Sequence, residues 1–184
     1  PVEGFLRMKP HEIPSLSNAK RIYVLGCAGS GKSTTARKLH KILKLPVAHL
    51  DVEYWKPGWV EPTDAEWRIH LKKLVSQKTW IMDGSHVSRA DITFPEADII
   101  IFLNVPRYKC LWRVIKRRIV HRKTPRSDIP VHCPERPTWK FLKWIWNYDQ
   151  TKTQRIFKAV EVYSHDHKFF VIKNNSELHD LLSN

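Results

Sequence analysis

The sequence predicts an α/β fold in which helices cover both faces of a parallel, five-stranded sheet. Short apolar segments alternate with helical patterns along most of the 184 residues, and this alternation is typical of parallel strands joined by crossover helices. The segment 98–105 is apolar at nearly every position, as expected for a central strand that is covered on both faces. A glycine-rich segment follows the apolar run at 21–25, which indicates a tight turn between a strand and a helix.

The expected strands are apolar segments that lie between turn-forming residues. They occupy residues 21–25, 47–50, 79–82, 98–105 and 168–172. The stretch from 53 to 62 is predicted to be a loop, because Pro57, Gly58 and Pro62 interrupt it. Asp51 and Asp83 are each expected at the end of a strand.

The expected helices have recognisable starts and ends. Pro46 ends the first helix, since proline removes a backbone donor. Thr63 and Glu66 have the spacing of a capping box at the start of the second, and Pro106 suits the first turn of the third. The helices are expected at 33–45, 63–77, 106–122, 138–162 and 176–182.

Length and composition suit one folded domain. Residues 1–19 contain three prolines and no periodic pattern, so we expect an N-terminal extension there and the folded domain at 20–184. The net charge of +14 favours polyanionic ligands. Three cysteines without a CxxC spacing favour a reducing, cytoplasmic compartment. No apolar run of 18 or more residues is present, so we expect no transmembrane helix and no membrane partner.

Residues 26–33, GCAGSGKS, match the P-loop pattern G-x-x-x-x-G-K-[ST]. Backbone N–H groups of such a loop point at phosphate oxygens, and the following helix adds its positive N-terminus. Lys32 is expected at the β- and γ-phosphates and the Ser33 hydroxyl on Mg²⁺. The pattern therefore predicts a P-loop NTPase that binds ATP with Mg²⁺. The expected nucleotide-binding residues are Gly26, Cys27, Ala28, Gly29, Ser30, Gly31, Lys32, Ser33 and Thr34.

Two carboxylates are expected at the same edge of the sheet as the P-loop. Asp83 could hold Mg²⁺ together with Ser33, or it could belong to a structural Asp-Gly turn. Asp51 could orient an acceptor hydroxyl or take its proton, or it could cap a loop. We interpret Asp83 as a metal ligand and Asp51 as a catalytic residue on the acceptor side.

Basic and aromatic residues complete the predicted site. Arg113 and Arg117 lie four residues apart and share one helix face, from which they could stabilise the charge of a transferred phosphoryl group. Trp55, in the segment Trp55-Lys-Pro-Gly-Trp59, could line the acceptor or pack in the core. The proline-rich segment 123–137 is expected to be a loop or a small lid.

Several longer segments resemble the adenylate-kinase-like P-loop proteins that carry the family label DNA topology modulation protein. The resemblance covers about residues 20–175, and its most specific segments are WKPGW at 55–59 and LKWIWNY at 142–148. It implies the adenylate kinase strand order 2-3-1-4-5, ATP and Mg²⁺, and a P-loop kinase-like domain at 20–184. Asp51 is similar in position to the acceptor-binding aspartate of shikimate and gluconate kinases.

The acceptor-binding segment differs from that of nucleotide monophosphate kinases. Those enzymes carry Asp-Gly-Phe-Pro-Arg after the third strand, whereas this chain continues from Asp83-Gly84 with SHVSR at 85–89. Arg89 is therefore expected on the substrate side, but no particular acceptor is implied.

The sequence favours transfer of the γ-phosphoryl group of ATP to a small acceptor such as a nucleotide, a nucleoside or a metabolite. The alternative is a nucleotide-gated nucleic-acid-binding protein with weak ATPase activity, which the net charge of +14 and the interleaved aromatic residues would permit. The sequence indicates no oligomeric state.

Overall fold

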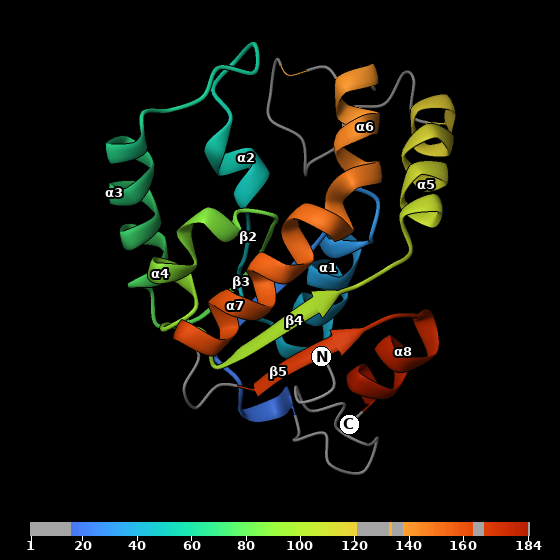
Figure 1. Cartoon of the computed structure of the whole chain (residues 1–184). Helices are drawn as coiled ribbons and strands as arrows, with labels where there is room; N and C mark the ends of the chain where they lie inside the picture. Colours follow the sequence, from blue (N-terminus) through green and yellow to red (C-terminus); the bar gives the residue numbers. More distant parts are fainter. Residues whose placement is uncertain (1–15, 121–132, 134–137, 164–167, 184) are drawn as a thin grey trace.

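The computed structural model describes residues 16–120, 133, 138–163 and 168–183, and it contains a five-stranded parallel sheet (Figure 1). The strand order is β2-β3-β1-β4-β5, so the predicted α/β fold class and strand order are confirmed. The strands are β1 (Arg21–Gly26), β2 (Val47–His49), β3 (Trp80–Gly84), β4 (Ile99–Leu103) and β5 (Lys168–Ile172).

The register brings the ends of three strands to one edge of the sheet. Leu25 of β1 lies beside Gly84 of β3, and Gly26 lies beside Leu103 of β4. Every residue of β3 and β4 is buried, as the apolar runs predict for strands covered on both faces. The carboxyl edge of the sheet, where ligands bind in such folds, therefore has β1 at its centre.

Helices cover both faces of this sheet, as predicted (Figure 1). The principal helices are α1 (Lys32–Leu43), α3 (Asp64–Val75), α5 (Arg107–Val120), α6 (Trp139–Tyr148), α7 (Gln154–Tyr163) and α8 (Asn175–Ser183). Shorter elements are η2 (Leu16–Asn18), α2 (Leu50–Tyr54), η3 (Val87–Arg89), α4 (Ala90–Thr93) and η4 (Asp149–Thr153). The capping box at Thr63 and Glu66 forms as expected.

Two apolar cores form, one on each face of the sheet. Alternate residues of β1 enter different cores: Tyr23 and Leu25 face the core under α3, α4, α5, α6 and α7, and Val24 faces the core under α1 and α8. This alternation follows from the two-residue period of a strand. Leu16 and Ala19 are also buried in the α1–α8 core, ahead of the predicted domain boundary at residue 20. The division into 1–19 and 20–184 stays a prediction.

The second strand is shorter than predicted, and the following residues form α2 instead of a loop. Asp51 therefore lies in the first turn of a helix, not at the end of a strand. Leu50 is buried and packs against Gly84, where an added Cβ would lie 3.0 Å from the Leu50 Cβ. This contact turns the chain toward β3, and the acidic Asp51 and Glu53 suit the positive end of a helix.

The predicted helix at 138–162 is divided into α6 and α7 by η4, which is a π-helical turn. The buried positions Tyr148 and Ile156 are eight residues apart, whereas two α-helical turns span about 7.2 residues. The wider π turn takes up this extra residue and keeps both side chains on the core. The predicted lid at 123–137 lies outside the described residues except for Cys133.

Candidate functional site

The P-loop connects β1 to α1 and packs against the beginning of α5. Gly29 and Gly31 have φ values of 81° and 103°, in the left-handed region that favours glycine. A Cβ at Gly29 would lie 2.4 Å from the carbonyl oxygen of Cys110, whereas a Cβ at Gly31 would meet nothing within 4 Å. Glycine at position 29 therefore lets the loop approach α5 closely.

Gly29→Ala should lower the free energy of unfolding by more than Gly31→Ala. Both changes place a side chain at positive φ, at a cost of roughly 1–3 kcal/mol, but only Gly29→Ala also forces a methyl group against the Cys110 backbone. Urea unfolding of the two variants measures the difference. Equal destabilisation would show that the packing of the loop on α5 contributes nothing beyond backbone strain.

Lys32 opens α1 and is only 7% exposed. Its Nζ donates a hydrogen bond to the carbonyl oxygen of Cys27 at 3.1 Å, so the ammonium group lies across the P-loop. The same loop is closed by a hydrogen bond from the Ser30 N–H to that carbonyl at 3.1 Å. A buried ammonium beside inward-curling backbone is the arrangement that binds phosphate oxygens.

Ser33 and Asp83 meet at the carboxyl edge of the sheet. The Ser33 hydroxyl donates to Asp83 Oδ2 at 2.8 Å, although the two residues are 50 positions apart in the sequence. Asp83 is 3% exposed, and its other oxygen contacts His49 Nδ1. His49 and Asp83 are register neighbours on β2 and β3, which places their side chains together.

This oxygen pair fits a magnesium ion. Mg²⁺ prefers hard oxygen ligands, and it is commonly held by one or two protein groups together with phosphate oxygens and water. Ser33 provides a hydroxyl and Asp83 a buried carboxylate, both beside the P-loop. The two predicted metal ligands are thus brought together.

Asp51 lies at the same edge and interacts with His86. His86 Nε2 is 3.3 Å from Asp51 Oδ1. Partial burial opposes ionisation of Asp51, but the hydrogen bond from His86 and the positive charge of Lys32 outweigh it and hold the pKa of Asp51 below its usual range. Asp51 is therefore a carboxylate at neutral pH, within the electrostatic influence of the P-loop lysine.

Arg113 reaches the P-loop from α5. Its Nη1 donates to the carbonyl oxygen of Ser30 at 3.1 Å, with the Gly29 carbonyl oxygen at 3.4 Å. Arg117 follows one turn later on α5 and is partly buried. The predicted pair thus includes one arginine in direct contact with the phosphate-binding loop.

Trp55 belongs to an aromatic cluster that extends to His86. Its ring meets those of Tyr54 and Trp59 edge to face, with centroids 5.0 and 5.4 Å apart. Tyr54 in turn lies 4.7 Å from the His86 ring. Trp55 is therefore linked by side-chain contacts to the surroundings of Asp51.

Arg89 interacts with the first residue of α3. Its guanidinium forms an ion pair with Asp64, and its Nη1 donates to the carbonyl oxygen of Ser88 at 2.7 Å. None of its hydrogen bonds or ion pairs given by the structure is to a P-loop residue. Its assignment to the substrate side stays a prediction.

His49 and His86 are site residues that were not predicted from the sequence. Each contacts a predicted site carboxylate, Asp83 and Asp51 respectively. Their closeness to predicted site residues was a signal in the sequence, because His49 lies two residues before Asp51 and His86 lies three residues after Asp83. Each histidine contacts the carboxylate that is farther from it in the sequence. This pairing is visible only in the three-dimensional structure.

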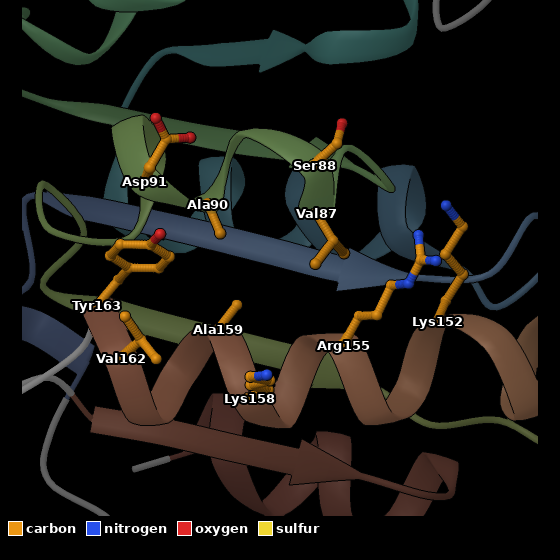
Figure 2. A pocket seen from close by; sticks show the side chains of 10 residues that line it. All are labelled: Val87, Ser88, Ala90, Asp91, Lys152, Arg155, Lys158, Ala159, Val162 and Tyr163. Atoms are coloured by element: carbon orange, nitrogen blue, oxygen red, sulfur yellow. The ribbon is translucent and has the colours of Figure 1, made fainter.

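A groove of about 300 Å³ lies between η3–α4 and α7 (Figure 2). Val87, Ala90 and Ala159 give it apolar walls, and Lys152, Arg155 and Lys158 of η4 and α7 border it. Asp91 is the one carboxylate among the lining residues, and it pairs with Arg68 at 2.8 Å. The groove therefore has a positive border and does not include the P-loop residues.

Comparisons with known proteins agree with the fold. No protein-family model matches the chain, and no curated protein matches it. Shikimate kinase from Acinetobacter baumannii, solved in complex with shikimate, is 15% identical, with 91% of each chain covered and a TM-score of 0.57. A kinase-like protein from Chloroflexus aurantiacus is 14% identical, with 88% of this chain and 94% of that chain covered and a TM-score of 0.53.

The strand order and these likenesses establish the fold, which is shared with P-loop kinases. The likenesses are to the fold alone, and the DNA topology modulation family stays an expectation from the sequence. In the described part of the chain, no helix combines the length and apolarity needed to cross a bilayer.

Proposed function

We propose that this protein is a magnesium-dependent phosphotransferase that moves the γ-phosphoryl group of ATP to a small acceptor. The observation that carries the proposal is the 2.8 Å contact between Ser33 and Asp83, which joins the P-loop helix to the end of β3. These two oxygens would hold the metal, and Ser33 directly follows Lys32, whose ammonium is buried. A P-loop, a lysine and two magnesium ligands are the recurring parts of phosphoryl transfer from a nucleoside triphosphate.

The P-loop residues from Gly26 to Thr34 would bind the triphosphate. In this role Lys32 leaves the Cys27 carbonyl and pairs with the β- and γ-phosphates, whose charge attracts it more strongly than a neutral carbonyl. Arg113 and Arg117 would stabilise the charge that spreads over the transferred group. Arg113 already contacts the loop, so it needs only a local movement to reach a phosphate there.

Ser33 and Asp83 would hold Mg²⁺, whose charge, when the ion is bound, neutralises the β- and γ-phosphate oxygens. The role of the protein is to hold these two ligands in place. The contact of His49 with the second oxygen of Asp83 restrains that carboxylate and leaves Oδ2 directed at Ser33.

Asp51 would act on the acceptor. Its carboxylate would receive the proton of an acceptor hydroxyl while the hydroxyl oxygen forms a bond to the γ-phosphorus and ADP departs with the electrons of the broken P–O bond. Trp55 and its aromatic neighbours would form one wall for the acceptor. Arg89 would contribute to acceptor binding only after release from Asp64.

His86→Phe should move the acid limb of the pH–activity profile to higher pH. The hydrogen bond from His86 lowers the pKa of Asp51, so its removal raises that pKa. Asp51 is active when deprotonated, and a higher pKa makes activity fall earlier as the pH decreases. Phenylalanine keeps a ring beside Tyr54 and Trp67. The measurement is kcat/KM against pH.

His70→Phe is the matched control for this change. His70 also stacks on Trp67, but its hydrogen bond is to Glu53 at 2.7 Å and not to Asp51. The control profile should keep the wild-type acid limb. If the acid limb of the His86→Phe profile does not move, the group whose titration produces that limb is not Asp51.

The proposed function is tested by ADP formation from ATP and Mg²⁺ with a panel of nucleotides, nucleosides and sugar acids. At least one acceptor should raise ADP formation above the rate without acceptor, and the phosphorylated product should appear in equal amount. ATP binding without acceptor-dependent turnover across the panel would contradict the proposal.

We further propose a cytoplasmic location, since none of the three cysteines, all in the described part of the chain, forms a disulfide.

Nucleotide-gated nucleic-acid binding is the second candidate function. Nucleic acid would bind at the groove in Figure 2, because Lys152, Arg155 and Lys158 border this groove at helical spacing. Binding through phosphates weakens steeply as salt rises. Salt-sensitive DNA or RNA binding that also depends on ATP would favour this candidate over acceptor phosphorylation.

A further inference from the structure

The outer side of α5 exposes an apolar stripe. Tyr108, Trp112, Ile115 and Ile119 are separated by four, three and four residues, a spacing that places them on one helix face. Trp112 is 62% exposed and Ile119 is 70% exposed. Large apolar side chains at this spacing normally face a core or a partner, so a stripe of them at the surface indicates a contact surface.

The rest of α5 is already used by the fold and the candidate site. Cys110 and Val114 are fully buried in the core, and Arg113 contacts the P-loop. The apolar stripe lies on a different side of the helix from these residues and contributes to neither. Among the described residues, neither core packing nor the candidate nucleotide site accounts for the exposure of this stripe.

Helix α6 lies next to α5 and also exposes large apolar side chains. Trp139 and Trp146 lie seven residues apart, about two turns, and so occupy one face of α6. Trp139 is 81% exposed. Arg107 of α5 lies 4.2 Å from the centre of the Trp146 ring, and the two helices stand side by side (Figure 1). We call Tyr108, Trp112, Ile115, Ile119, Trp139 and Trp146 the α5–α6 face.

The charge of both helices has one sign. Neither the 14 residues of α5 nor the 10 residues of α6 include an aspartate or a glutamate. Exposed lysines occur on both helices, at Lys109, Lys116, Lys140 and Lys143. A partner of this face must therefore accept apolar side chains and carry negative charge.

We propose that the α5–α6 face binds the surface of an anionic lipid bilayer. Tryptophan and tyrosine favour the headgroup level of a membrane, and a helix with aromatic and aliphatic residues flanked by lysines lies in the interface plane. Anionic headgroups attract the surrounding lysines. The sequence-based expectation of no membrane partner rested on the lack of a spanning segment, which this surface contact does not require.

A second copy of the chain is a less suitable occupant. A symmetric contact would bring the same face of two molecules together. The lysines of α5 and α6 would then approach lysines of the other copy, and like charges disfavour such an interface. A lipid surface meets both requirements, because its headgroups supply the negative charge and its acyl boundary receives the apolar side chains.

The test is sedimentation of the full chain with lipid vesicles. One set contains equal parts of phosphatidylcholine and phosphatidylglycerol, and the other contains phosphatidylcholine alone. We expect binding to the anionic vesicles at least about tenfold stronger than to the neutral ones at low salt, with weakening as salt rises. The combined change Trp112→Gln and Ile119→Gln should lower binding by about tenfold or more, since two apolar anchors are lost.

Ile69→Gln is the matched control. Ile69 is 71% exposed, close to the 70% of Ile119, but it lies on α3, which is far from α5 and α6 (Figure 1). It should leave vesicle binding unchanged. Thermal unfolding of each variant shows that the fold is kept, which is expected for side chains exposed to this degree.

Three results would overturn the proposal. The first is no binding to anionic vesicles at low salt. The second is binding that the double variant does not weaken, because charge alone would then explain it. The third is a dimer in solution that the double variant dissociates, together with no vesicle binding, which would assign the face to a second copy.

Discussion

Lys32→Ala should lower ATP-dependent phosphoryl transfer by roughly 10²- to 10³-fold, the usual loss when one charge-stabilising group is removed from a transition state. The buried ammonium lies across the P-loop, where β- and γ-phosphates are expected to bind. Alanine keeps the helix start but removes the positive charge from beside the phosphates. Calorimetric titration with ATP and Mg²⁺ measures the expected loss of ATP affinity, and steady-state ADP formation measures the loss of phosphoryl transfer.

Lys38→Ala is the control for the change in net charge. Lys38 lies on the same helix, α1, and is exposed to solvent. It should affect neither ATP affinity nor turnover beyond about twofold, since exposed charges are screened. Unchanged ATP affinity together with unchanged turnover in Lys32→Ala would remove the P-loop from the mechanism and contradict the proposed function.

Asp51→Asn should separate the acceptor side of the site from the nucleotide side. Asparagine keeps the shape of the side chain but removes its charge and most of its basicity. We expect phosphoryl transfer to fall by roughly 10²-fold or more, the scale of general base catalysis, with little change in affinity for ATP and Mg²⁺. The metal pair Ser33 and Asp83 does not include Asp51, which is why binding should survive. Single-turnover kinetics and calorimetry on the same variant measure both quantities.

Glu53→Gln is the matched control for this change. Glu53 lies in the same short helix, α2, and its side chain bonds His70 at 2.7 Å. It should leave transfer near the wild-type rate. If Asp51→Asn also keeps its turnover but unfolds at a lower temperature, Asp51 is a structural residue of α2. If ATP affinity collapses instead, Asp51 belongs with Asp83 in the metal site.

Much of the fold could be predicted because its signals are local. The P-loop pattern at 26–33, the apolar runs and the capping box at Thr63 each depend on residues close together in the chain. The fifth strand appears at the expected residues, 168–172, since aromatic and β-branched residues there follow the pattern of a buried strand. Helix starts and ends were placed to within a few residues for the same reason.

The predictions that were wrong depended on distant contacts. Residues 50–54 form α2 because Leu50 packs on Gly84, more than thirty positions away. The π turn between α6 and α7 keeps Tyr148 and Ile156 on one core, and the helical pattern of either segment alone contains no sign of it. Local propensity is a weak preference that packing can override.

By itself, the sequence determined the class of fold, the P-loop and the residue types that could bind phosphate and magnesium. Only the tertiary structure decided which of those residues meet: Ser33 with Asp83, Asp51 with His86, and Arg113 with the loop carbonyls. It also decided that the apolar stripe of α5 faces outward. The physical reason is that a motif is defined by neighbours along the chain. A site or a surface is defined by strand register and helix packing, which join residues that are far apart in the sequence.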